Sequence, residues 1–129
     1  MYKFSQRSLD NLATCHPDLQ KIAEKLITIW DCAVICGHRT KEDQEKSFHD
    51  GNSKLEWPDS PHNSFPSMAM DIVPYPIDWK DTDRFFFQAG LVKGIAESMG
   101  IKIRWGNDWH DDNIFTNDTF HDYPHFELK

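Results

Sequence analysis

Two histidines and an aspartate, far apart in the chain, have the chemistry to bind a catalytic zinc ion. His62 lies in a loop, and Asp71 begins an apolar run that ends at Pro74. His125 lies near the other end of the sequence, at the start of a short apolar segment. Zinc in hydrolytic sites accepts imidazole and carboxylate ligands and leaves its fourth position to water. We therefore expect His62, Asp71 and His125 to hold one zinc ion.

A second acid lies beside the last of these candidates. Asp122 precedes His125, and Pro124 between them favours a turn that leads into a strand. A carboxylate next to the metal can take a proton from water and pass it to the departing amine, so Asp122 is the expected general base and acid. Glu127 falls on the same strand face as His125 and could orient its imidazole, or it could be a solvated acid. His121 would compete as a ligand if this segment were helical, which Pro124 disfavours.

The cysteines offer two weaker schemes. Cys32 and Cys36 with His16 or His38 could bind zinc, but their spacing matches no zinc-finger pattern and the thiols flank an apolar run. A cysteine nucleophile is equally weakly supported, because nothing near Cys15, Cys32 or Cys36 indicates an exposed thiolate. Both schemes rank below the site built on two histidines and an aspartate.

Length and composition indicate one domain. A chain of 129 residues can form a single core, over residues 1–129, without disulfides. The three cysteines show no secretory spacing, and no stretch approaches the roughly 20 apolar residues of a membrane span. We expect a monomer without a signal peptide or stable membrane association, made in the cytoplasm. The net charge of −7 disfavours nucleic-acid binding.

The apolar pattern predicts alternating helices and strands. Helices are expected over residues 8–13, 17–30, 40–48 and 83–99, and strands over 32–36, 69–73, 101–105 and 125–128. The last helix is expected to bury Phe85, Phe86, Ala89, Val92, Ala96 and Met99. Two long loops remain between these elements: residues 51–67 are expected to form an ordered loop that contains His62, and residues 106–121 a loop that is functional or mobile.

An arginine and several tryptophans are the expected substrate contacts. Arg39 lies at a strand-to-helix junction, directly before the expected N-cap residue Thr40. A guanidinium there suits an anionic group or a developing oxyanion, and the alternative is a surface ion pair. Trp57, Trp105 and Trp109 could line a cleft or could act as local packing anchors.

These residues form motifs that resemble a known family. In chain order the motifs are Ser60-x-His62, Ala69-x-Asp71, Trp105-Gly106-Asn107-Asp108-Trp109 and Asp122-x-x-His125-x-Glu127. They are similar to the motifs of the zinc peptidases that include D-alanyl-D-alanine carboxypeptidases and phage L-alanyl-D-glutamate endopeptidases. Gly37-x-Arg39-Thr40, followed by Gln44, is similar to the stretch that carries a substrate-binding arginine in that family. The resemblance covers nearly the whole chain.

The resemblance implies a small α+β domain, in which an antiparallel sheet carries the zinc site and helices pack on the sheet, as in hedgehog-type and lysostaphin-type domains. It implies one zinc ion per chain on His62, Asp71 and His125, with Asp122 as catalytic base and Arg39 facing the substrate. The expected substrate-binding or supporting residues are Ser60, Gln44, Trp105, Trp109 and Glu127. Eight residues separate His62 from Asp71, more than is usual in the family, and Ser67 stands where a glycine is usual. We expect this loop to differ from its relatives.

The implied function is hydrolysis of a peptide bond in the peptidoglycan stem, with L-alanyl-D-glutamate as the first candidate. Such an enzyme would be a phage endolysin that reaches the wall after release across the host membrane. A D,D-carboxypeptidase that trims the terminal D-alanine is the second candidate. The third is a non-catalytic wall-binding or virion module of the same fold, against which Asp122 argues, because such a module needs no base.

Overall fold

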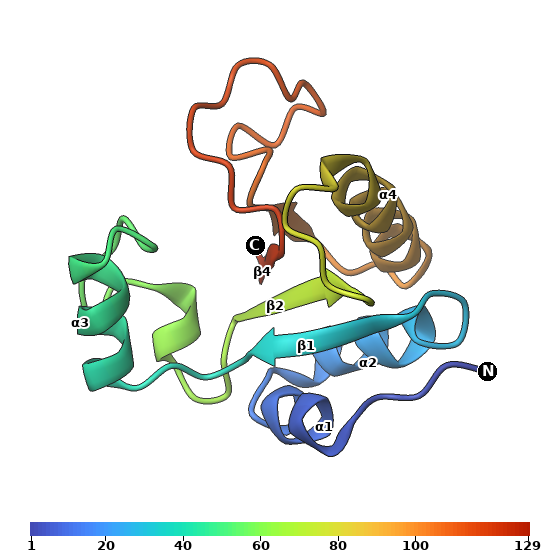
Figure 1. Ribbon diagram of the computed structural model, residues 1–129, viewed down its shortest axis with the longest axis horizontal. Coiled ribbons are helices and arrows are strands. Elements are labelled where there is room, and N and C mark those ends of the chain that lie inside the picture. Colours follow the sequence, from blue (N-terminus) through green and yellow to red (C-terminus); the bar gives the residue numbers. More distant parts are fainter.

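A four-stranded antiparallel sheet forms the centre of the computed structural model, which describes residues 1–129 (Figure 1). Its strands are β1 (Cys32–Cys36), β2 (Ala69–Pro74), β3 (Ile103–Trp105) and β4 (His125–Leu128), in the order β1-β2-β4-β3. The last strand of the sequence therefore lies inside the sheet, where it pairs with both β2 and β3. This register sets Asp71 of β2 directly opposite His125 of β4. The expected α+β fold with an antiparallel sheet is confirmed.

Four helices and one 3-10 turn complete the fold. They are α1 (Gln6–Ala13), α2 (Pro17–Leu26), α3 (Lys41–His49), η1 (Pro61–Asn63) and α4 (Thr82–Ser98). Figure 1 shows α1 and α2 beside β1, and α3 set apart beyond the end of that strand. Side chains fix the helix starts: Thr40 accepts a hydrogen bond from the Asp43 amide, and Asp81 accepts one from the Arg84 amide. None of the helices combines the length and apolar character that a membrane span requires.

One face of the sheet is apolar and packs on the helices. Met70 and Ile72 of β2 and Phe126 of β4 are fully buried in a core shared with α1, α2 and α4. Burial of each such side chain stabilises the fold by roughly 1.5–3 kcal/mol. Because successive side chains of a strand point to opposite faces, Asp71 and His125 face away from this core. The apolar face thus fixes the side on which the polar residues gather.

The ends of two elements differ from the prediction. The second helix ends at Leu26 and not near Trp30, because Ile27 is its C-cap and residues 27–30 form a turn. Trp30 still contacts α4, where its indole donates a hydrogen bond to Gln88 over 3.2 Å. The third strand begins at Ile103 and not at residue 101, because its pairing with β4 starts there.

Helix α4 buries as many side chains as its spacing predicts, but Gln88 and Ile95 are buried in place of Phe86 and Met99. Phe85, Ala89, Val92 and Ala96 are buried as expected. Phe86 is 37% exposed and Met99 is 40% exposed, so both were wrongly assigned to the core. Phe86 follows Phe85 by one residue and therefore points to a different side of the helix, where it meets Phe115 of the second loop edge to face.

The unusual connection between His62 and Asp71 is anchored to the turn between α1 and α2. The Ser67 amide donates to the Thr14 carbonyl over 2.8 Å, and the His16 amide donates to the Ser67 carbonyl over 2.9 Å. The Ser67 side chain is fully buried and donates to the Ala69 carbonyl over 2.6 Å. The loop is therefore ordered by its own hydrogen bonds before it enters β2.

Candidate active site

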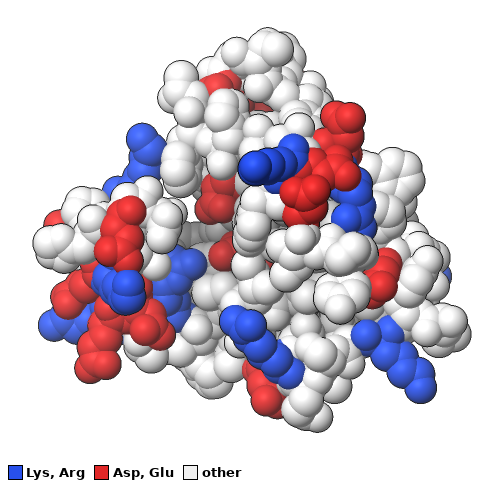
Figure 2. All heavy atoms as spheres, in the orientation of Figure 1, with Lys and Arg blue, Asp and Glu red and all other residues white.

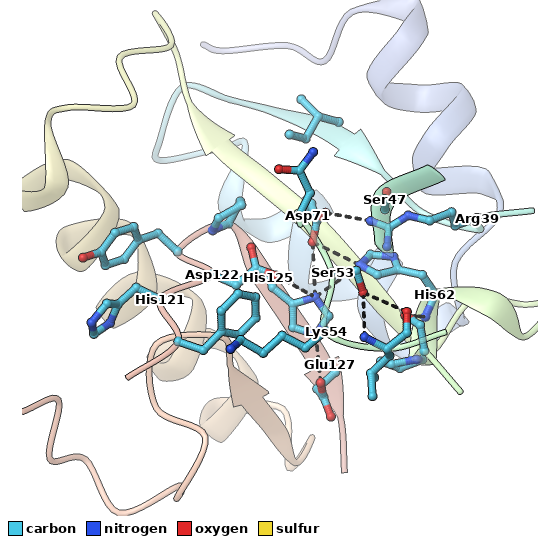
Figure 3. Close-up of a pocket in the computed structure, with 18 of the residues that line it drawn as sticks. Arg39, Ser47, Ser53, Lys54, His62, Asp71, His121, Asp122, His125 and Glu127 are labelled. Carbon is cyan, nitrogen blue, oxygen red and sulfur yellow. Dashed lines mark hydrogen bonds and ion pairs between the residues drawn. The ribbon is translucent and has the colours of Figure 1, made fainter. Parts of the chain in front are cut away.

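The three expected zinc ligands meet on the polar face of the sheet (Figure 3). His62 Nε2 lies 3.1 Å from Asp71 Oδ1 and 3.2 Å from His125 Nδ1, and the latter two atoms are 3.3 Å apart. The 3-10 turn η1 supplies His62, β2 supplies Asp71 and β4 supplies His125. Three potential donor atoms thus form a nearly equilateral triangle between segments that are far apart in the sequence.

Hydrogen bonds on the outer side orient both imidazoles. His62 Nδ1 donates to the Gly37 carbonyl over 2.7 Å, and His125 Nε2 donates to Glu127 Oε1 over 2.8 Å. With a metal ion in the triangle, each ring would keep its proton on the outer nitrogen and direct the lone pair of its inner nitrogen toward the ion. Two lone pairs and a carboxylate oxygen at these distances repel one another unless protons or a metal ion lie between them. The donor set is therefore suited to a metal ion.

The spacing of the donors fits zinc. A tetrahedron with metal–ligand bonds of about 2.0–2.1 Å has edges of about 3.3–3.4 Å. The observed distances of 3.1, 3.2 and 3.3 Å lie within a few tenths of an ångström of that edge. Two imidazole nitrogens and one carboxylate oxygen are also ligands that zinc accepts. Cys36, which lies within reach of His62 and Asp71, faces the His62 nitrogen that Gly37 already occupies.

Burial and opposite charge shift the pKa values of these groups. Burial alone would lower the pKa of His62, but the charge and hydrogen bond of Asp71 raise it to about 10. Burial would also lower the pKa of His125, but its hydrogen bonds to Asp71 and Glu127 raise this pKa to about 9. Burial would raise the pKa of Asp71, whereas the two imidazoles hold it well below its usual range. Asp71 is therefore ionised, and a metal ion that binds here would displace the protons of the two inner nitrogens.

Asp122 lies at the edge of the triangle. Its Oδ2 is 3.8 Å from His125 Nδ1, and its amide donates to the Gly106 carbonyl over 2.8 Å. Burial raises the pKa of Asp122 to about 6, and the charge of Asp71 acts in the same direction. A carboxylate with a pKa near neutrality can both accept and release a proton under working conditions.

Arg39 approaches the site from the side of Asp71. Its guanidinium lies 3.7 Å from Asp71 Oδ2 and donates to Gln44 Oε1 over 3.0 Å. Gln44 is fully buried, and its amide donates to Ser53 and to the Leu55 carbonyl. Gln44 therefore holds Arg39 and the following loop in place and does not reach the cavity.

A cavity of about 810 Å³ opens in front of these residues. Figure 2 shows it as a hollow with atoms of acidic residues visible inside, between α3 and the loop over residues 106–121. Its lining contains eight of the ten expected site residues: Arg39, Ser60, His62, Asp71, Trp109, Asp122, His125 and Glu127. Ser60 also caps η1, because its hydroxyl accepts a hydrogen bond from the His62 amide over 3.2 Å. The cavity gives an extended ligand access to the triangle.

The tryptophans occupy different positions. Trp109 lines the cavity, where its ring lies 5.5 Å from that of His125 and its indole donates to the Phe120 carbonyl over 2.8 Å. Trp105 was expected near the substrate, but it is 1% exposed, packs in the core and donates to the Tyr123 carbonyl over 2.7 Å. Successive side chains of β3 point to opposite faces of the sheet, and Trp105 lies on the face that packs against α4. Trp57 does not line this cavity.

The competing metal schemes are not formed. His121 donates to Asn107 through Nδ1 and lies outside the triangle. Cys32 is buried in the core, whereas His16 Nδ1 accepts the Asp18 amide as the cap of α2. His38 faces the Ser64 carbonyl over 3.0 Å. Burial also raises the pKa of Cys15 and Cys32 to about 12, which makes neither thiol a nucleophile.

Sequence reasoning placed Gly37 and Gly106 in motifs but assigned no role to either glycine. A Cβ on Gly37 would lie 2.3 Å from the Asn11 carbonyl oxygen. A Cβ on Gly106 would lie 2.3 Å from the Asp122 carbonyl oxygen and 2.8 Å from the His125 Cβ. Both glycines allow the backbone of a distant segment to approach closely, and no local sequence signal identifies that segment.

Fold and site together define a class of peptidase. The family model for phage L-alanyl-D-glutamate peptidase matches residues 1–129, and the chain belongs to this family. The L-alanyl-D-glutamate peptidase of Escherichia phage T5 is 32% identical over 114 residues, which cover 84% of this chain and 82% of that protein. The crystal structure of the Serratia marcescens L-Ala D-Glu endopeptidase ChiX has a TM-score of 0.75 at 25% identity, covering 99% of this chain and 91% of that one. The resemblance seen in the sequence is confirmed.

Proposed function

We propose that this chain is a zinc-dependent endolysin that hydrolyses the L-alanyl-D-glutamate bond of the peptidoglycan stem. Membership of the peptidase family and the names of both relatives support peptidoglycan peptidase activity. The observation that carries the metal assignment is the triangle of His62 Nε2, Asp71 Oδ1 and His125 Nδ1, with edges of 3.1–3.3 Å. Asp122 beside this triangle adds the base that hydrolysis needs.

The chain's own residues divide the work of the reaction. Zinc held by His62, Asp71 and His125 would polarise the scissile carbonyl and lower the pKa of water. Asp122 takes the proton of the attacking water and then delivers it to the departing amine. The Gly37 carbonyl and Glu127 accept the protons of the outer nitrogens and so aim the inner nitrogens at the ion.

Arg39 supports the electrophilic side of the reaction. Gln44 holds its guanidinium next to Asp71, at the wall of the cavity. A fixed positive charge at this position would stabilise negative charge that develops on the carbonyl oxygen. Replacement by lysine would remove the planar group that contacts Gln44 and Asp71 at the same time.

We also propose that residues 1–129 form one catalytic domain that acts as a monomer with one zinc ion. The domain would accumulate in the host cytoplasm and act on peptidoglycan after it crosses the membrane. We expect the enzyme to act on peptidoglycan without a nucleic-acid partner and without stable membrane association.

Mass spectrometry of digested peptidoglycan tests the bond. Cleavage between L-alanine and D-glutamate releases peptides with an N-terminal D-glutamate and leaves L-alanine on the glycan. A D,D-carboxypeptidase releases free D-alanine instead, and this product would overturn the proposed bond. Zinc-loaded protein with no turnover on any peptidoglycan would favour the non-catalytic module.

The Asp122→Ala variant tests the base. We expect zinc content near one ion per chain and loss of peptidoglycan hydrolysis by about 10²–10⁴-fold, the range of general acid–base catalysis. Asp10→Ala is the matched control, because Asp10 lies exposed on α1, where its side chain accepts a hydrogen bond from Gln6. Activity retained by Asp122→Ala would overturn the assignment of Asp122.

A further inference from the structure

The cavity contains one cation that the proposed reaction does not use. Its lining carries the acids Asp71, Asp122 and Glu127 and the bases Arg39 and Lys54. Arg39 is paired with Asp71. Lys54 forms no ion pair within 4.0 Å and its ammonium donates no hydrogen bond to a protein group. In a chain with a net charge of −7, a lysine without an acidic partner at the active site calls for an explanation.

Lys54 crosses from one wall of the cavity to the other. It follows Ser53 on the loop after α3, and its Nζ lies 5.2 Å from the centroid of the Phe120 ring on the second loop. Figure 3 shows the side chain extended toward the side of the cavity where His121 and Asp122 lie. Phe120 stacks on Trp109 at 6.0 Å, so the ammonium rests on a preformed aromatic surface. A cation on a partly exposed ring such as Phe120 is held weakly enough for an anion to compete for it.

The proposed substrate, on which this inference rests, brings such an anion. The amine side of an L-alanyl-D-glutamate bond is a glutamyl residue, which carries one carboxylate besides the one that continues the peptide. Asp122 delivers its proton to this amine, so the glutamyl residue lies on the side of Asp122, toward which Lys54 extends. Arg39 and the proposed zinc ion lie beside Asp71, so Lys54 is the lysine or arginine that reaches the side of Asp122, where the acid would otherwise repel a further carboxylate.

We propose that Lys54 binds the free carboxylate of the D-glutamyl residue and makes the enzyme prefer this form over its amide, isoglutamine. Phe120 holds the ammonium near its working position before the substrate arrives, which lowers the entropy cost of binding. Lys54 is a specificity residue in this scheme. Asp122 and the zinc ligands perform the chemistry on both forms of the substrate.

The test compares two soluble stem peptides that differ only in a glutamate carboxylate or amide. For the unmodified enzyme we expect kcat/KM to be about tenfold higher for the carboxylate, the low end for a hydrogen bond to a charged group. Lys54→Gln should bring the ratio close to one by lowering kcat/KM for the carboxylate peptide alone. Lys54→Arg should retain most of the preference. Lys46→Gln is the matched control, because Lys46 pairs with Asp50 on α3 and does not line the cavity.

Each other outcome is decisive. An equal loss on both peptides would show that Lys54 only supports the loop and would overturn the proposal. A Lys54→Gln variant that keeps the wild-type ratio, or a wild-type enzyme without any preference, would overturn it as well. Each of these leaves the proposed function intact, because the carboxylate peptide is still cleaved between alanine and glutamate. Failure of the unmodified enzyme to cleave either peptide would overturn the proposed function, and the role of Lys54 with it.

Discussion

Replacement of Gly106 by alanine is the sharpest test of how the second loop builds the site. The added Cβ would lie 2.3 Å from the Asp122 carbonyl oxygen, 2.8 Å from the His125 Cβ and 3.0 Å from the Asp122 Cβ. Two hydrogen bonds of 2.8 Å hold these segments together, from the Gly106 amide to the His125 carbonyl and from the Asp122 amide to the Gly106 carbonyl. The methyl group must therefore push the proposed base and a proposed ligand away from β3.

The size of the effect follows from these distances. A carbon–oxygen contact of about 3.3 Å is tolerated, so the two backbones must separate by about 1 Å. Overpacking of this kind costs about 1–3 kcal/mol, and weakening two buried hydrogen bonds adds about 1 kcal/mol. We expect Gly106→Ala to lower the free energy of unfolding by about 3 kcal/mol. A shift of about 1 Å in Asp122 and His125 should also lower kcat/KM by about 10²-fold and weaken zinc binding.

Chemical denaturation, metal analysis and peptidoglycan hydrolysis measure the three effects. Gly94→Ala is the matched control, because a Cβ there meets nothing within 4 Å and Gly94 lies in α4. This control should stabilise the protein by about 0.4–1 kcal/mol and leave activity unchanged. A Gly106→Ala variant with wild-type stability, one zinc ion and full activity would refute the close approach on which the reasoning depends.

Two further predictions concern the groups around His125. Glu127→Gln removes the negative charge that accepts a hydrogen bond from His125 Nε2 over 2.8 Å. Zinc affinity, measured by competition with a chelator, should therefore fall by about tenfold. Glu97→Gln, on the exposed side of α4, is the control and should leave zinc affinity unchanged. Equal affinity in both variants would contradict an orienting role. Asp122 accepts a proton only when ionised, and burial with the charge of Asp71 raises its pKa to about 6. The value of kcat/KM should therefore rise with pH up to about 6 and fall by about tenfold per unit below it; an acid limb centred near 4, the ordinary aspartate value, would contradict this assignment.

Local patterns predicted the elements well where one side chain or one apolar run decides the outcome. The run from Cys32 to Cys36 is stopped by Gly37, and the strand has these bounds. Thr40 caps α3 as its position before a polar helix indicates. The final strand His125–Leu128 was also predicted. The motif Asp122-x-x-His125-x-Glu127, which overlaps this strand, supplied one of the three expected metal ligands.

Tertiary contacts explain what the sequence could not reveal. Helical spacing does not distinguish Phe85, which is buried, from Phe86, which packs on a loop. A tryptophan in a motif gives no sign of which face it takes, so Trp105 was expected at the substrate and lies in the core. Lys54 looks like an ordinary polar loop residue until Phe120 is placed opposite it.

The position of β4 inside the sheet has a consequence for how the protein opens. His62 and Asp71 belong to the part of the chain that includes β2, whereas His125 enters with β4, which alone connects β3 to the rest of the sheet. An ion shared by these three residues would fasten β4 to β2 from the polar face. Detachment of β4 in a local opening would then require release of the ion, so bound zinc would protect the amides of β3 and β4 from hydrogen exchange more than those of α1. The amount of bound metal would thus determine how often β3 and β4 open, as well as the activity of the enzyme.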